Sequence, residues 1–188
     1  MKRLLFLVLV APFLLAALPT YRPIQTCYSP SYYYPPSCHW MSALSVMGDS
    51  LELEDGAVWK TDQRALSDIF YWTSSDPLVL TQNQEWFSTF QYRLINLNTG
   101  GGVPVNLFLG PVLANSHAKF LSHFDFQQGV AFLTDGTRWE ICPRDYSKFY
   151  QWILDDCILI GSNSGWESTY DCILINSNMN HFVRARQY

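Results

Sequence analysis

The stretch LEDGAVW at residues 53–59 returns as LTDGTRW at residues 133–139. The two copies lie 80 residues apart, and the match continues without a gap from 53–103 to 133–183, where 17 of 51 aligned positions are identical. Similarity at a fixed spacing indicates that one structural unit occurs twice. The sequence therefore predicts a tandem duplication.

Both copies show the same succession of predicted elements. An alternating strand leads to an Asp-Gly pair, at Asp55 and at Asp135, and a second strand carries Trp59 or Trp139. Asp-Gly favours a two-residue hairpin of type I′, because glycine tolerates a positive φ. A short helix with apolar residues at i, i+3 and i+4 follows, and then three more strands. The order β-β-α-β-β-β predicts a mainly β fold with one short helix per repeat, built as two tandem small barrel-like or rolled-sheet domains, SH3-like in size.

The N-terminal segment has the composition of an export signal. Lys2 and Arg3 precede an apolar run that extends to Leu18 and is broken only by Pro12. This run is shorter than the ~20 residues that a membrane-spanning helix needs, so a secretory signal peptide is favoured over a retained anchor. The prolines and tyrosines that follow indicate an extended linker, with a tyrosine-rich partner-binding segment as the alternative.

These features divide the chain into five parts. They are a signal peptide at 1–18, a Pro/Tyr-rich linker at 19–50, repeat 1 at 51–107, a connector at 108–129 and repeat 2 at 130–188. The connector is more apolar than a free linker, so we expect it to pack against one or both repeats.

Composition narrows the classes of ligand. A net charge of -4 and scattered basic residues argue against a broad nucleic-acid surface. The five cysteines show no C-x-x-C or Cys/His spacing, so no metal site and no cofactor are predicted. In an oxidising compartment a Cys27–Cys38 disulfide is the favoured pair. A further pair among Cys142, Cys157 and Cys172, with one thiol left over, and five free thiols are the alternatives.

A polar loop with the pattern Asn-x-x-Trp-x-Ser-Thr occurs in both copies. Its candidate ligand-binding residues are Asn83, Trp86, Ser88, Asn163, Trp166 and Ser168. Loops often carry function, and an aromatic face beside amide and hydroxyl groups suits a sugar ring or a peptide. A tryptophan folded back to cap the barrel is the alternative interpretation. The repeated tryptophans within strands and helices, by contrast, fit a role in the core.

Arg184 and Arg186 alternate on the last predicted strand, so both side chains face the same way. They are candidates for an anion-binding pair, and a charged edge strand that resists aggregation is the alternative. The sequence contains no recognisable catalytic motif, and none of its four histidines is repeated.

Together these patterns predict an exported, non-catalytic binding protein that is secreted, periplasmic or associated with a bacterial envelope. Its expected partner is an unidentified protein or glycan, and contact with a membrane is expected only if the N-terminal segment is retained as an anchor. Carbohydrate or cell-wall binding through Trp86 and Trp166 is one alternative. A hydrolase or thiol enzyme that uses a second-repeat cysteine is another.

Overall fold

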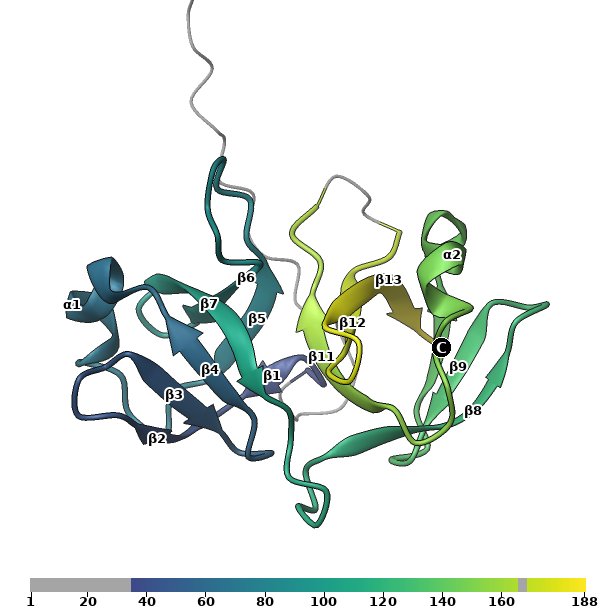
Figure 1. Ribbon diagram of the computed structural model, residues 1–188, viewed down its shortest axis with the longest axis horizontal. Coiled ribbons are helices and arrows are strands. Elements are labelled where there is room, and N and C mark those ends of the chain that lie inside the picture. Colours follow the sequence, from purple (N-terminus) through teal and green to yellow (C-terminus); the bar gives the residue numbers. More distant parts are fainter. Residues whose placement is uncertain (1–34, 166–168) are drawn as a thin grey trace, which may run out of the picture.

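The computed structural model describes residues 35–165 and 169–188. This part of the chain forms strands that roll into two adjoining halves, with two short helices (Figure 1). The first half contains β1 (Cys38–His39), β2 (Met41–Leu44), β3 (Ser50–Leu53), β4 (Val58–Thr61), β5 (Leu78–Gln82), β6 (Tyr92–Asn96) and β7 (Gly102–Leu109). The second half contains β8 (Lys119–Asp125), β9 (Val130–Leu133), β10 (Arg138–Ile141), β11 (Cys157–Ser162), β12 (Cys172–Asn176) and β13 (His181–Gln187). Helices α1 (Leu66–Ile69) and α2 (Tyr146–Phe149) each continue a 3₁₀ turn, at Gln63–Ala65 and Pro143–Asp145. The mainly β prediction is confirmed.

The second half is a closed six-stranded barrel. Hydrogen bonds join its strands in the order β11-β12-β13-β10-β9-β8, and β8 pairs back to β11. β8 closes this ring because its start pairs with β11 and the rest of it pairs with β9. Closure of a sheet on itself removes the free edges that would otherwise invite aggregation.

The first half has the same succession of partners, but its first strand is split. β2 pairs with β3, and the sheet continues through β4, β7 and β6 to β5. β1 pairs with β5, and Trp40 alone separates β1 from β2. This bent segment therefore joins the two ends of the sheet in the way that β8 does.

Residue partners in the two halves differ by a constant 80 positions. Three sets of pairs show this: His39↔Leu78 and Lys119↔Ile158, Met41↔Leu53 and Leu121↔Leu133, and Val79↔Ile95 and Leu159↔Ile175. Because side chains alternate between the faces of a strand, positions 80 apart face the same side of their sheets. We call such positions equivalent.

Three strands lie where the sequence predicted connecting segments. β1 and β2 lie within the linker predicted at 19–50, and β8 lies within the connector predicted at 108–129. The proline-rich composition ends just before β1 and masked the strand that follows. β1 and the start of β8 also pair with β5 and β11, which are distant in the sequence, and local patterns do not reveal such pairing. Each half thus begins with a strand that the order β-β-α-β-β-β omitted.

The Asp-Gly hairpins form, with a different turn from the one predicted. Gly56 and its equivalent Gly136 have φ angles of 84° and 83°, but the aspartates before them have no positive φ. A type I′ turn needs a positive φ at both positions, so this assignment was wrong. Gly56 N–H donates to Leu53 O at 2.9 Å, and the Asp55 carboxylate accepts from Ala57 N–H at 2.9 Å.

The two halves share one sheet and part of one core. β5 and β11 lie side by side in parallel, with Thr81 opposite Ser162. Leu159, Ile173 and Ile175 of the second half pack into the cluster of buried residues of the first half. Burial of apolar surface drives association, so this shared cluster ties the halves into one packed body.

The repeated tryptophans of the strands and helical segments form the core, as predicted. Trp59 and Trp139 are fully buried, and Trp72 and Trp152 are 6% and 1% exposed. Each contributes a large apolar surface to a small core. None of the described helices has the length and apolarity needed to cross a membrane.

Candidate functional site

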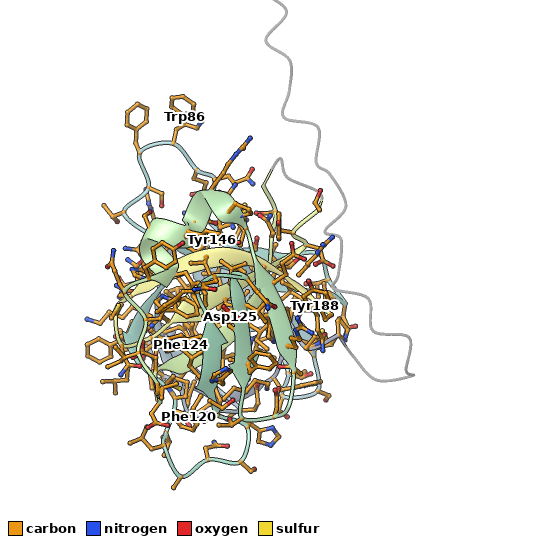
Figure 2. All side chains as sticks on the ribbon, turned by 90° about the vertical axis from the view of Figure 1, so that its right-hand side faces the viewer. Trp86, Phe120, Phe124, Asp125, Tyr146 and Tyr188 are labelled. Atoms are coloured by element: carbon orange, nitrogen blue, oxygen red, sulfur yellow. The ribbon has the colours of Figure 1, made fainter. Side chains whose placement is uncertain are left out.

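The loop between β5 and β6 projects from the body of the molecule (Figure 1), and Trp86 lies at its outer end (Figure 2). Trp86 is 88% exposed and Phe87 is 101% exposed. We call these two residues the aromatic tip. For Trp86, the interpretation in which the ring folds back over the barrel is therefore wrong.

A tight turn directs the aromatic tip away from the body. Ser88 N–H donates to Glu85 O at 3.3 Å, so residues 85–88 form a β-turn with the tip at its centre. Phe87 occupies the third position of this turn and has a φ of 66°. Turns with a positive φ at this position usually have glycine there, because the Cβ of other residues is strained. The chain thus holds a bulky apolar residue in a strained conformation that faces solvent.

The polar residues of the loop motif build the loop itself. Asn83 Nδ2 donates to Ser88 Oγ at 2.9 Å and to Phe90 O at 3.0 Å. Asn83 Oδ1 accepts from Glu85 N–H at 3.2 Å, and Ser88 Oγ accepts from Phe90 N–H at 3.2 Å. The structure therefore uses the polar atoms of these two predicted ligand-binding residues inside the loop.

In the second copy of the motif, the asparagine also forms hydrogen bonds within its own loop. Asn163 Nδ2 donates to Tyr170 O at 2.6 Å, and Asn163 Oδ1 accepts from Gly165 N–H at 2.9 Å. The other two predicted binding residues of this loop, Trp166 and Ser168, lie outside the described residues.

The two loops touch at their bases. Gln84 Nε2 donates to Ser164 O at 2.6 Å and lies 3.1 Å from Ser164 Oγ. Gln84 and Ser164 occupy equivalent positions. The contact follows from the parallel pairing of β5 with β11, because parallel strands end at the same edge of a sheet. Both loops accordingly rise from one end of the molecule (Figure 1).

Charged groups near the aromatic tip occur as pairs of opposite sign. Arg93 Nη1 lies 2.6 Å from Glu85 Oε1, and Arg93 Nη2 donates to Gly102 O at 2.9 Å. Arg64, whose charge also interacts with Glu85, lies 2.7 Å from Asp62. Exposed pairs add little stability, but these leave the base of the tip close to neutral.

The predicted anion-binding pair faces carboxylates. Arg184 donates from Nε and Nη2 to the Asp145 carboxylate at 2.8 and 3.0 Å, and Arg186 Nε donates to Glu140 at 2.7 Å. Burial acts to raise the pKa of Asp145, but its hydrogen bonds with Arg184 hold that pKa below its usual range. The structure thus gives no support to an anion site here. The edge-strand interpretation is also wrong, because β13 pairs with both β10 and β12.

The cysteines differ from the favoured pairing. Cys38 has a free, buried thiol, so the structure does not contain the predicted Cys27–Cys38 disulfide, and Cys27 itself lies outside the described residues. Cys172 is disulfide-bonded. Burial raises the pKa of both Cys38 and Cys157 to about 11. A thiol with such a pKa is a poor nucleophile near neutral pH.

A buried ion pair at the joint between the halves escaped prediction. His39 Nδ1 lies 2.9 Å from Glu54 Oε1, and His39 Nε2 lies 2.8 Å from Ile160 O. A carboxylate and a carbonyl both accept, so the ring carries a proton on each nitrogen. Burial acts to lower the pKa of His39, but the charge and hydrogen bond of Glu54 raise it to about 9. The sequence repeat does not point to His39, because the equivalent residue in the second half is Lys119.

Comparison with known proteins gave no match. No family model, curated protein or solved structure matched this chain. Within the described ranges, no group of His, Cys, Asp and Glu side chains is arranged to hold a metal ion. The aromatic tip is therefore the local geometry that best supports a function.

Proposed function

We propose that this chain is an exported, non-catalytic binding protein that contacts its partner through the aromatic tip. The observation that carries the proposal is the turn at residues 85–88, which holds Trp86 and Phe87 in solvent. Exposed aromatic pairs are unfavourable in water and are the residue types that dominate binding energy at interfaces. A strained backbone at an exposed Phe87 adds to this, because strain persists where function requires it.

The size of the contact sets an expected strength. Full burial of a large apolar side chain contributes about 1.5–3 kcal/mol, so the two side chains together contribute roughly 3–6 kcal/mol before the costs of association. The costs of association are of similar or larger size, so the aromatic tip alone supports only weak binding. A second contact beside the aromatic tip would strengthen binding by avidity.

We further propose that the chain arose by tandem duplication of one β unit. The 17 identities in 51 positions and the constant offset of 80 in strand pairing both support this. The proposal accounts for the two Asn-x-x-Trp loops that rise from adjacent strands. It also places Trp166 at the position equivalent to Trp86.

Export is supported by two independent features. The sequence begins with a basic and then apolar segment of signal-peptide type. Cys172 is disulfide-bonded, and disulfides persist mainly in oxidising compartments outside the cytosol. We therefore propose a secreted, periplasmic or envelope-associated protein.

The two other functional hypotheses lack a supporting observation. A sugar site needs polar groups beside the aromatic ring, and in this loop Asn83 and Ser88 are bonded to the loop itself. A thiol enzyme that uses a second-repeat cysteine needs an accessible thiolate, whereas Cys142 and Cys157 are buried, burial raises the pKa of Cys157, and Cys172 is disulfide-bonded.

Sedimentation with isolated bacterial envelopes tests the proposal. We expect Trp86→Ala and Phe87→Gly each to lower the bound fraction of the full chain by about tenfold. Tyr71→Ala is the matched control, because Tyr71 is 83% exposed but lies outside this loop. Equal binding of the wild type and both tip variants would sink the proposal.

A further inference from the structure

We propose that the surface contacted by the aromatic tip is the interfacial region of a lipid bilayer. This inference rests on the proposed function and names its partner by chemistry. It extends the sequence-based expectation, which allowed membrane contact only through a retained N-terminal anchor.

The arrangement of the two rings is poorly suited to a sugar. The centroids of Trp86 and Phe87 lie 6.5 Å apart, and the ring planes are inclined by 60°. The two rings therefore do not form one flat platform on which a pyranose could stack. The amide of Asn83 and the hydroxyl of Ser88 bond within the loop.

The surroundings of the aromatic tip are also poorly suited to a protein pocket. Aromatic residues that anchor protein interfaces usually lie at the centre of a contact patch, whose rim excludes water from them once the partner is bound. Trp86 instead stands at the end of a projecting loop (Figure 2), and both Trp86 and Phe87 are almost wholly exposed. A bilayer needs no complementary rim, because fluid lipid chains surround an inserted side chain whatever its shape.

The chemistry of the aromatic tip matches the bilayer interface. A tryptophan ring combines a large apolar body with a polar N–H and is enriched at the level of lipid headgroups. Phe87 supplies a wholly apolar side chain beside it. The turn bond between Ser88 N–H and Glu85 O satisfies backbone groups that would otherwise resist entry into an apolar phase.

The charges at the base of the tip set the depth and the lipid preference. Glu85 and Arg93 form an ion pair and remain at the level of the headgroups, because insertion of charge into the hydrocarbon is costly. Arg64 is paired with Asp62. With no excess of positive charge, binding should depend little on anionic lipid or on salt.

Quenching of Trp86 by brominated lipids tests the inference in the full chain. Vesicles of phosphatidylcholine with brominated acyl chains quench only tryptophans that enter the bilayer. The signal of Trp86 is the difference between the wild type and Trp86→Phe, which keeps an apolar ring at this position. This difference isolates Trp86 from the N-terminal apolar segment and from the other tryptophans.

We expect the Trp86 signal to be quenched, with equal strength in neutral and anionic vesicles. Phe87→Gly should lower the lipid partition of the tip by about tenfold. Tyr71→Ala should leave it unchanged, and salt raised from about 0.1 to about 1 M should have little effect. A Trp86 signal unaffected by brominated lipid, or quenching unaffected by Phe87→Gly, would overturn the inference.

A parallel assay on purified cell-wall glycan separates this inference from the proposed function. If Trp86→Ala and Phe87→Gly abolish retention on glycan while brominated lipid leaves Trp86 unquenched, the lipid inference fails and the binding function stands. If the tip variants change neither quenching nor retention on glycan or envelopes, both proposals fail.

Discussion

Equivalent positions in the two halves differ in how they satisfy their buried polar atoms. Trp139 Nε1 donates to Thr137 Oγ1 at 2.8 Å, whereas the equivalent Trp59 Nε1 is buried without a partner. Ala57, the equivalent of Thr137, offers no acceptor. Tyr92 OH is also buried without a partner, and burial raises the pKa of Tyr92. Cys172, the equivalent of Tyr92, is disulfide-bonded instead.

This contrast places the unpartnered buried polar atoms in one half. Among the described residues, the buried side-chain polar atoms without a hydrogen-bond partner all lie between Ser37 and Tyr92. Each such atom costs about 1–3 kcal/mol. Positive φ at residues other than glycine occurs in both halves, at Phe87, Asp155 and Asn180, but phenylalanine adopts it less readily than aspartate or asparagine. Local departures from the rules of stable folding concentrate at functional sites, so the first half is the one that we expect to carry the contact.

The largest expected difference in stability between the halves is at His39 in β1 and the equivalent Lys119 in β8. His39→Ala leaves the Glu54 carboxylate partly buried without its cation and should lower the free energy of unfolding by about 3–5 kcal/mol. Lys119→Ala, at the equivalent position, removes a partly exposed ammonium 4.0 Å from Asp135 and should cost less than about 1 kcal/mol. Urea denaturation followed by circular dichroism measures both. Equal losses would show that the buried pair does not brace the joint.

A pH series tests the same pair without mutation. Folding raises the pKa of His39 from 6.5 to about 9, so its protonated form stabilises the protein fully below pH 6.5. That contribution, up to about 3 kcal/mol, should be lost as pH rises from 6.5 towards 9. Urea midpoints of the wild type should fall over this range more steeply than those of His39→Gln. Parallel curves for the two proteins would contradict the assignment.

Gly161 is the next most sensitive position, because it lies where the halves meet. A Cβ added there would lie 2.5 Å from Leu80 O of the neighbouring half. Since backbone cannot yield easily, Gly161→Ala should cost about 1–3 kcal/mol. Gly101→Ala is the control, with its nearest contact at 3.3 Å to the Thr99 hydroxyl. Similar melting temperatures for the two variants would mean that β5 and β11 can separate at little cost.

Thr137→Ala makes the second half resemble the first. The substitution removes the acceptor of Trp139 Nε1, which lies at 2.8 Å. We expect a loss of about 1 kcal/mol in the free energy of unfolding. Thr134→Ala, which removes the hydroxyl that accepts from Phe120 N–H at an exposed site, is a control for loss of a threonine. A neutral Thr137→Ala would show that an unpartnered indole N–H costs little in this core.

The smallest expected effect has the opposite sign. Phe87→Gly relieves a positive φ of 66° at an exposed position and should raise the free energy of unfolding by about 0.5–1 kcal/mol. Trp86→Gly is the control, because Trp86 has no positive φ and gains no relief. Thermal denaturation compares the two. If Phe87→Gly is no more stable than Trp86→Gly, the positive φ of Phe87 does not destabilise the protein.

Sequence patterns predicted what is local in this fold. The strands that flank the Asp-Gly turns and the buried tryptophans follow from alternation and spacing, because each signal lies within a few residues. The first strand of each half was missed because proline dominates the segment before β1, and because β1 and the start of β8 pair with the distant strands β5 and β11. Arg184 was predicted to bind an anion because its partner, Asp145, reaches it only in the folded chain.

The sequence likewise predicted only part of the candidate site. The motif identified the loop that carries Trp86, but whether the ring packs or projects depends on the backbone of Phe87. Nothing in the sequence marks a phenylalanine with positive φ, because glycine is the residue that normally signals it. His39 was invisible for a related reason, since Ile160 lies 121 residues away.

The burial of Leu159, Ile173 and Ile175 against the first half also governs when that half can fold. A chain that emerges N-terminus first presents residues 38–109 long before it presents these three side chains. Contacts between segments so distant along the chain form slowly and only after both have emerged. The first half therefore remains incompletely packed until residue 175 has been made.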